Sequence, residues 1–273
     1  NLAAVLRRES MIISLKGESN TAKSSFPLTG PHKILYLETD PGGFNRAFLE
    51  CKDDIINGNI VFKSYPLPKE VLRAALVKQD KGFRIRGMKE LWGAFVEDFC
   101  TGLEDDGTKL ITVDTYSQMH QILMAAYLQE KQEGQEVNGK LPAGKTYREN
   151  LTQIEYGQIN SRMHTMLDQA NVYDKNMVII HHMTDVWGPV MKDGKIDQGV
   201  IGRDAKGWKN CGYAASDLAD IVLETKRTTV TNNKGPITSF SVVYTKAPPA
   251  LMGVTVENPT WDKIVKQVKF VKG

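Results

Sequence analysis

The feature that most constrains the fold is an apolar segment that runs directly into a polar, glycine-bearing loop. Met11–Leu15 has the length and composition of a buried strand, and the loop follows it as Gly17-Glu18-Ser19-Asn20-Thr21-Ala22-Lys23-Ser24. The loop matches the pattern G-x-x-x-x-G-K-[ST], except that Ala22 occupies the position of the second glycine. A strand that delivers such a loop to a helix is a unit of α/β proteins. The pattern therefore predicts a sheet with helices on its faces.

Each part of this loop has a role in binding a phosphate. Backbone N–H groups surround the β-phosphate, and a helix opened by residues 22–26 is expected to point its N-terminus at the same charge. Lys23 supplies a cation to the β- and γ-phosphates, and the Ser24 hydroxyl coordinates Mg²⁺. We therefore expect ATP to be bound by Gly17, Glu18, Ser19, Asn20, Thr21, Ala22, Lys23, Ser24 and Ser25.

Two alternatives to this interpretation stay open. The segment can be a polar turn that precedes a helix without binding a phosphate. Ala22 resists the positive φ and the close backbone approach that glycine tolerates, so binding is less sensitive to this departure than fast hydrolysis.

Apolar runs and helical periodicity alternate over the rest of the chain. Further strands are predicted at residues 33–37, 60–62, 109–113, 177–180, 220–224, 228–231 and 239–244. Helices are predicted at 1–10, at 69–99 with an interruption near 81–87, at 117–128 and at 155–170. Hairpin connections are expected at Asp193-Gly194 and at 232–235. This order predicts an α/β fold, with a mainly parallel sheet flanked by helices and an antiparallel extension near the C-terminus.

Two predicted strands end in carboxylates. Asp114 follows the strand at 109–113 and is placed to hold a metal ion, directly or through water, at the carboxyl edge of the sheet. The strand at 33–37 runs into Glu38 and Asp40, either of which can align the attacking water. The structural alternatives are a turn-forming aspartate and an acidic turn before Pro-Gly-Gly.

Composition limits the partners only weakly. The formal net charge of +3 is too small to indicate a nucleic-acid partner, so a DNA-binding surface has to be a local patch. No apolar run approaches the roughly 18 residues needed to cross a bilayer, and residues 1–10 lack the apolar centre of a secretory signal. We therefore expect no membrane partner. Cys51, Cys100 and Cys211 are far apart, which suits the reducing cytoplasm.

The chain resembles RecA-like recombination ATPases, most closely small phage-encoded ones linked to single-strand annealing. The resemblance is carried, in this order, by GESNTAKSS, KILYLETDPGG, KLITVDTYSQM, MVIIHHMTD, DLADIVLET and SVVYTKAPP, and it covers residues 11–262. It implies a RecA-like P-loop ATPase domain over residues 11–273, which uses ATP and Mg²⁺ in the cytoplasm of a bacterial host. It also implies a homo-oligomer, as a filament or a ring, in which the helix at 1–10 contacts a neighbouring subunit.

The resemblance assigns roles to individual residues as well. The acid after the second strand is the catalytic carboxylate in this family, and Asp40 occupies that place. A polar residue after the fourth core strand couples the γ-phosphate to a DNA-binding loop, and His182 occupies that place with His181 beside it. Lys246 looks like the basic residue that reaches the nucleotide of the neighbouring subunit. The alternatives are a histidine that only completes a strand end and a surface lysine.

Two segments correspond to the DNA-facing loops of the family, at about residues 129–145 and 185–208. Lysines together with an aromatic side chain suit phosphate contact and base stacking on single-stranded DNA. The residues concerned are Lys131, Lys140 and Lys145 in the first loop, and Lys192, Lys195, Arg203, Lys206 and Trp208 in the second. A solvated loop face has the same composition.

The leading hypothesis is a DNA-stimulated ATPase that binds single strands and promotes annealing or strand exchange. Its expected catalytic residues are Asp40, Glu38, Lys23, His182 and Lys246, and its metal ligands are Ser24 and Asp114. One alternative is a nucleotide-binding assembly or switch module with little hydrolysis. Another is a helicase or helicase loader, which needs a ring and a further partner-binding domain.

Overall fold

The computed structural model describes residues 10–40, 42, 51–76, 82–192, 195–205, 218–232 and 235–272. Apart from Ser10, the helix predicted at residues 1–10 lies outside this range, as do Lys206 and Trp208. None of the helices in the described part of the chain has both the length and the hydropathy of a membrane span.

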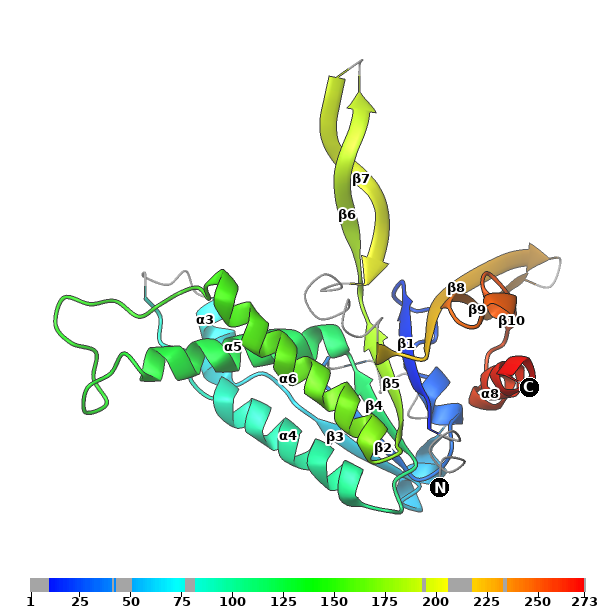
Figure 1. Ribbon diagram of the computed structural model, residues 1–273, viewed down its shortest axis with the longest axis horizontal. Helices are drawn as coiled ribbons and strands as arrows, with labels where there is room; N and C mark the ends of the chain where they lie inside the picture. The colour runs from blue at the N-terminus through cyan, green and yellow to red at the C-terminus, as the bar shows by residue number, and fades with distance from the viewer. Residues whose placement is uncertain are drawn as a thin grey trace.

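The centre of the protein is a sheet of eight strands in the order β10-β9-β8-β1-β5-β4-β2-β3 (Figure 1). The strands are β1 (Ile12–Gly17), β2 (Ile34–Glu38), β3 (Ile60–Ser64), β4 (Leu110–Asp114), β5 (Asn176–His181), β8 (Ile221–Asn232), β9 (Gly235–Lys246) and β10 (Thr255–Glu257). All neighbours from β3 to β8 are parallel, whereas β9 and β10 are added antiparallel. The prediction of a mainly parallel sheet with an antiparallel extension near the C-terminus is confirmed.

Helices cover both faces of the parallel strands (Figure 1). The helices α4 (Met88–Glu104), α5 (Tyr116–Glu133) and α6 (Gln153–Val172) pack on one face. The helix α8 (Trp261–Lys272) and the 3₁₀ helices η1 (Phe26–Thr29) and η3 (Pro249–Leu251) pack on the other. Successive side chains of a strand point to opposite faces, so in β1 Ile12 packs with the first set and Ile13 with the second. This two-sided burial explains why the strands are almost continuously apolar.

One predicted boundary between strands was wrong. The separate strands expected at 220–224 and 228–231 form the single strand β8, because Thr225, Lys226 and Arg227 continue its pairing with β9. The predicted helix at 69–99 is divided into α3 (Lys69–Leu76) and α4, and the break lies where it was expected. The helix α8 was not predicted at all.

The described chain also forms arms that stand away from the sheet (Figure 1). One is a hairpin of β6 (Met183–Lys192) and β7 (Lys195–Ala205), in which Lys192 pairs with Lys195. That pairing confirms the hairpin expected at Asp193-Gly194, although the two turn residues lie outside the described range. The outer part of the β8–β9 hairpin is a second arm. The connection of α5 to α6 is a third, but α5 continues to Glu133, so the first residues of the loop predicted at 129–145 are helical.

Candidate functional site

The loop after β1 meets the ends of β2, β4 and β5 at the carboxyl edge of the sheet. There they surround a cavity of about 430 Å³. Residues 19–25 of the loop line this cavity together with Asp40, Asp114 and His182. The structure thus brings together, from four separate segments, most of the side chains that sequence reasoning singled out.

Close contact with β8 determines the conformation at the start of the loop. Gly17 pairs with Thr225, and a Cβ atom at position 17 would lie 2.0 Å from Thr225 Oγ1 and 2.8 Å from Thr225 O. The hydroxyl groups of Thr21 and Thr225 are hydrogen-bonded at 2.6 Å. Only glycine fits at position 17, because any side chain there would collide with the neighbouring strand.

Ala22 adopts a left-handed backbone conformation, with a φ of 61°. This is the conformation that glycine tolerates and that costs a residue with a Cβ about 1–2 kcal/mol. With alanine in place of the motif's glycine, the loop keeps the positive φ at this position, and the backbone there is strained.

Lys23 lies buried inside the loop. Its Nζ donates hydrogen bonds to Gly17 O at 2.7 Å and to Glu18 O at 2.5 Å. A phosphate bound in the loop would have to exchange with these carbonyl groups as acceptors of the ammonium. The cation is held at the loop before any ligand arrives.

The prediction that residues 22–26 open a helix at the phosphate site was wrong. Ser25 N and Phe26 N both bond to Ala22 O in a turn, and only the four-residue 3₁₀ helix η1 follows. A longer helix cannot form because Gly30 is extended and precedes Pro31, a position that disfavours helical backbone. An anion in this cavity therefore depends on loop N–H groups and side-chain cations, without the dipole of a long helix.

Asp114 is the most buried acid of the cavity, with 3% of its surface exposed. Tyr36 donates a hydrogen bond from Oη to Asp114 Oδ2 at 2.5 Å, and Ser24 bonds to the same carboxylate through its side chain. Burial raises the pKa of Asp114, while these two hydrogen bonds act in the opposite direction. Burial also raises the pKa of Tyr36 well above its usual value, which keeps its hydroxyl protonated as a donor.

Ser24 and Asp114 fit a magnesium ion that arrives with a nucleotide. Both line the cavity, and both offer oxygen, the ligand that Mg²⁺ prefers. In nucleotide sites Mg²⁺ takes one or two carboxylates and completes its shell with phosphate and water oxygens. The described residues contain no cluster of three or more His, Cys, Asp or Glu side chains that could hold a metal without a ligand.

The structure separates the two candidates for the water-orienting acid. Asp40 lines the cavity, and its Oδ2 lies 2.9 Å from His182 Nε2. Glu38 is buried at the end of β2, where its Oε2 accepts a hydrogen bond from Ser64 Oγ at 3.1 Å, on the side of β3. Asp40 is therefore the acid in position to act on a bound ligand.

The adjacent histidines occupy different environments. His182 is 38% exposed in its side chain and lines the cavity. His181 is fully buried with its ring 5.4 Å from that of Tyr116, and burial lowers its pKa to about 3. His182 can respond to a ligand, whereas His181 belongs to the protein interior as a neutral side chain.

Lys246 lies away from this cavity. It pairs with Val222, near the amino end of β8, and its Nζ donates to Ala219 O at 2.8 Å. The predicted contact with a neighbouring subunit's nucleotide therefore stays a prediction.

The residues predicted to bind DNA are distributed over two arms. Lys131 lies 4.8 Å from the centre of the Tyr127 ring on α5, while Lys140 and Lys145 are exposed on the α5–α6 connection. Arg203 on β7 forms ion pairs with Glu18 of the loop after β1 and with Asp185. Arg203 therefore connects the β6–β7 hairpin to the loop after β1.

Arg227 and Phe240 also line the cavity, from the β8–β9 hairpin, and sequence reasoning did not single them out. Their position depends on the pairing of β8 with β1, which no local pattern reveals. No protein-family model matches the chain, and no curated protein matches its sequence significantly. The function is accordingly argued from the geometry of this cavity.

Proposed function

We propose that this chain is a Mg²⁺-dependent ATPase with a RecA-like core that acts on single-stranded DNA in recombination or annealing. The observation that carries the proposal is the convergence of Lys23, Ser24, Asp114 and Asp40 on one cavity. A cation, a hydroxyl and two acids at the carboxyl edge of a parallel sheet are the groups that phosphoryl transfer from a nucleotide requires.

Each residue would have a separate part in hydrolysis. The N–H groups of the loop and the Lys23 ammonium would bind the phosphates, and Asp40 would accept a hydrogen bond from the attacking water. His182 would hold Asp40 in that orientation through the contact of 2.9 Å. Magnesium held by Ser24 and Asp114 would supply positive charge beside the β- and γ-phosphates.

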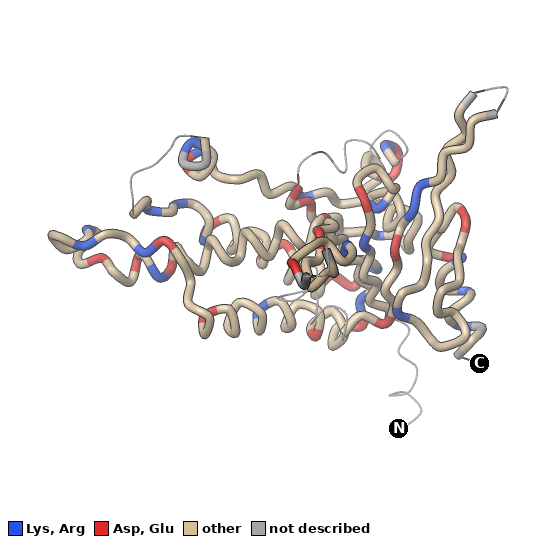
Figure 2. The backbone as a smooth tube through the Cα atoms, turned by 90° about the horizontal axis from the view of Figure 1, so that it is seen from above, with Lys and Arg blue, Asp and Glu red and all other residues tan. Residues whose placement is uncertain are grey.

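The β6–β7 hairpin supports the DNA part of the proposal. The sequence places Lys192 and Lys195 at its outer end, and two ion pairs fasten its base to the loop region: Arg203 with Glu18, and Lys16 with Asp204 at 2.8 Å. A strand of DNA bound at the outer end can therefore influence the loop through β7. Basic and acidic residues are interspersed along the described chain, so the DNA contact would be local rather than a continuous basic face (Figure 2).

The proposal is tested by measuring ATP turnover with and without single-stranded DNA. We expect turnover that requires Mg²⁺ and rises with DNA, and we expect Arg203→Ala to reduce the stimulation while leaving basal turnover within about twofold. Electron micrographs with ATP and DNA would distinguish a filament or ring from a monomer. The absence of any ATP binding would reject the proposal.

A nucleotide-dependent assembly or switch module is the second candidate. The strained φ of Ala22 and the bonds from Lys23 to the loop's own carbonyls favour it, because both make rapid ligand rearrangement in the loop costly. Stoichiometric ATP binding with negligible turnover, unchanged by DNA, would support this candidate over the ATPase.

A further inference from the structure

The β8–β9 hairpin contributes a wall to the cavity. Thr225 on β8 faces the phosphate loop, since its hydroxyl is bonded to that of Thr21. Side chains two residues apart on a strand share a face, so Arg227 points to the same side as Thr225. Phe240 is paired directly with Arg227 on β9, which places it on this face as well. Both side chains line the cavity.

The charges of the cavity call for a second cation. Lys23 already donates to two loop carbonyls, while Asp40 and Asp114 contribute two carboxylates to the lining of the cavity. A triphosphate with bound Mg²⁺ remains an anion. Arg227 is exposed and has no hydrogen-bond or ion-pair partner among the described residues. Its guanidinium can donate two parallel hydrogen bonds to a phosphate.

Phe240 has a different contribution, because it is the one apolar aromatic ring among the described residues that line the cavity, whose other side chains, except that of Ala22, are polar. An aromatic ring beside a phosphate site can stack on the base of a nucleotide, and stacking accepts every base because each has a π-face. A phosphate ion or an inorganic polyphosphate has no group that would use this ring.

We propose that Arg227 and Phe240 form the second wall of a nucleoside triphosphate site, in which Arg227 binds the phosphates and Phe240 stacks on the base. This inference rests on the proposed nucleotide binding and deepens it. It assigns the cation to the same subunit as the phosphate loop. It also predicts that the nucleoside, and not only the phosphate chain, contributes to affinity.

Calorimetric titration of the full chain with Mg²⁺-ATP and with Mg²⁺-tripolyphosphate separates the two roles. Phe240→Ala should weaken ATP binding about tenfold or more and leave tripolyphosphate binding unchanged. Arg227→Ala should weaken both by about tenfold or more, and Arg227→Lys should recover part of the loss. Ile237→Ala is the matched control, because Ile237 is 57% exposed and lies on the other face of the same strand. It should bind both ligands like the unaltered chain.

Phe240→Leu guards against a folding defect, since leucine preserves apolar volume but cannot stack. It should show the same selective loss of ATP affinity, and Phe240→Trp should show none. Equal effects of Phe240→Ala and Phe240→Leu on both ligands, or no effect on either, would overturn the inference. If the unaltered chain binds neither ligand, the proposed function itself fails. If it binds ATP through Lys23 while the wall variants behave like the control, the proposed function stands and this inference alone is rejected.

Discussion

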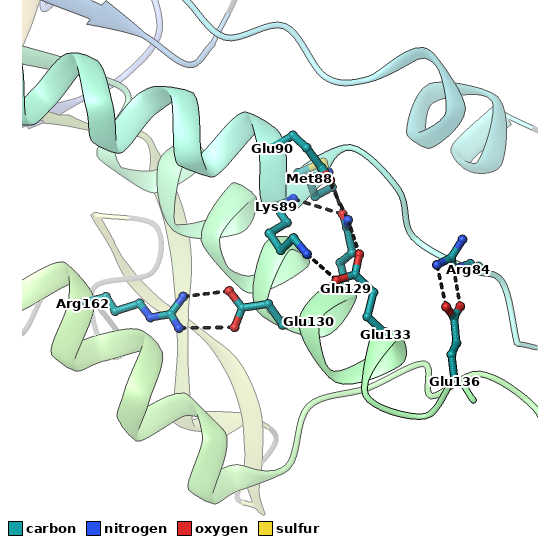
Figure 3. A network of polar contacts seen from close by, with 9 residues as sticks. All are labelled: Arg84, Met88, Lys89, Glu90, Gln129, Glu130, Glu133, Glu136 and Arg162. Carbon is teal, nitrogen blue, oxygen red and sulfur yellow. Dashed lines mark hydrogen bonds and ion pairs between the residues drawn. The ribbon is translucent and has the colours of Figure 1, made fainter. Parts of the chain in front are cut away.

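Two polar clusters of this protein are built in opposite ways. One surrounds the cavity at the carboxyl edge of the sheet. The other, here called the α4–α5 network, consists of Arg84, Met88, Lys89, Glu90, Gln129, Glu130, Glu133, Glu136 and Arg162 (Figure 3). In the network the polar groups drawn point toward one another, whereas the polar groups around the cavity, although some of them are bonded to one another, also line a space of about 430 Å³.

Gln129 shows how the network stabilises the fold. Its Oε1 accepts hydrogen bonds from Met88 N at 2.8 Å and Lys89 N at 3.0 Å, two N–H groups of the first turn of α4. Its Nε2 donates to Glu90 and Glu133. The residue before α4 provides no side-chain cap, so a glutamine from the neighbouring helix performs this role.

The residues around the cavity, in contrast, include several features that lower the stability of the fold. Ala22 is strained, Asp114 is a buried acid with a raised pKa, and Lys23 is a buried cation. These features cost stability in the absence of a ligand. Substitutions in the network should therefore change the free energy of unfolding, whereas substitutions in the cavity should change ligand binding or turnover.

Lys23→Ala should produce the largest effect, on nucleotide binding by the cavity. We expect at least a hundredfold loss of Mg²⁺-ATP affinity, because the variant removes the cation within the phosphate loop. The free energy of unfolding should change by less than about 1 kcal/mol, since Gly17 and Glu18 line a neighbouring pocket in which the two carbonyls it leaves can bond to water. Titration and denaturant unfolding of the same preparation check both expectations. Unchanged affinity in a folded variant would reject the phosphate-loop assignment.

Asp40→Asn should separate binding from chemistry within the cavity. We expect turnover to fall about a hundredfold while ATP affinity stays within about twofold, because the amide cannot act as a base toward the attacking water. Glu38→Gln is the matched control and should retain turnover, since Glu38 bonds to Ser64 instead of lining the cavity. Steady-state turnover of both variants decides the matter. A defect in Glu38→Gln alone would exchange the two roles.

Gln129→Leu tests the network. It leaves Met88 N and Lys89 N without their acceptor in a buried position, so the free energy of unfolding should fall by about 2–3 kcal/mol. Nucleotide affinity should not change. Gln121→Leu, an exposed position on the same helix, should shift stability by less than about 0.5 kcal/mol. Equal stability of the two variants in urea would show that the cap is not important.

The sequence predicted the parallel strands well, because two-sided burial makes them continuously apolar. It predicted Lys23, Ser24 and Asp114 through a motif and a strand end. The residues alone left Asp40 and Glu38 as alternatives, because strand ends do not reveal where a side chain points, and only the family resemblance favoured Asp40. The wall formed by β8 escaped detection for a related reason: Thr225 contacts Thr21 across 204 residues of sequence.

The helix α8 was missed although its signal was present. Trp261, Ile264, Val265 and Val268 recur at the spacing of one helical face, and they pack on the sheet. The expected helix after Ala22 is limited to a short 3₁₀ helix, because the Gly30-Pro31 pair is a stop signal.

Ala22→Gly should give the smallest effect. It tests whether the methyl group of Ala22 only adds strain to the loop or is needed for the conformation that hydrolyses ATP. Glycine relieves the cost of a φ of 61°, while it also increases the entropy of the unfolded chain, so the net gain in the free energy of unfolding should be about 0.5–1 kcal/mol. ATP turnover should be preserved or raised, because a freer backbone lets the loop adjust to the γ-phosphate.

Gly42→Ala is the opposite control, because it adds a side chain at a positive φ of 109°. Gly42 lies outside the loop after β1, so this substitution should only lower the free energy of unfolding. Unfolding in urea and turnover assays on both variants provide the measurements. A large loss of turnover in Ala22→Gly would mean that the methyl group of Ala22 itself shapes the loop. The strained backbone at Ala22 would then be part of the conformation that hydrolyses ATP, and glycine at this position would impair turnover.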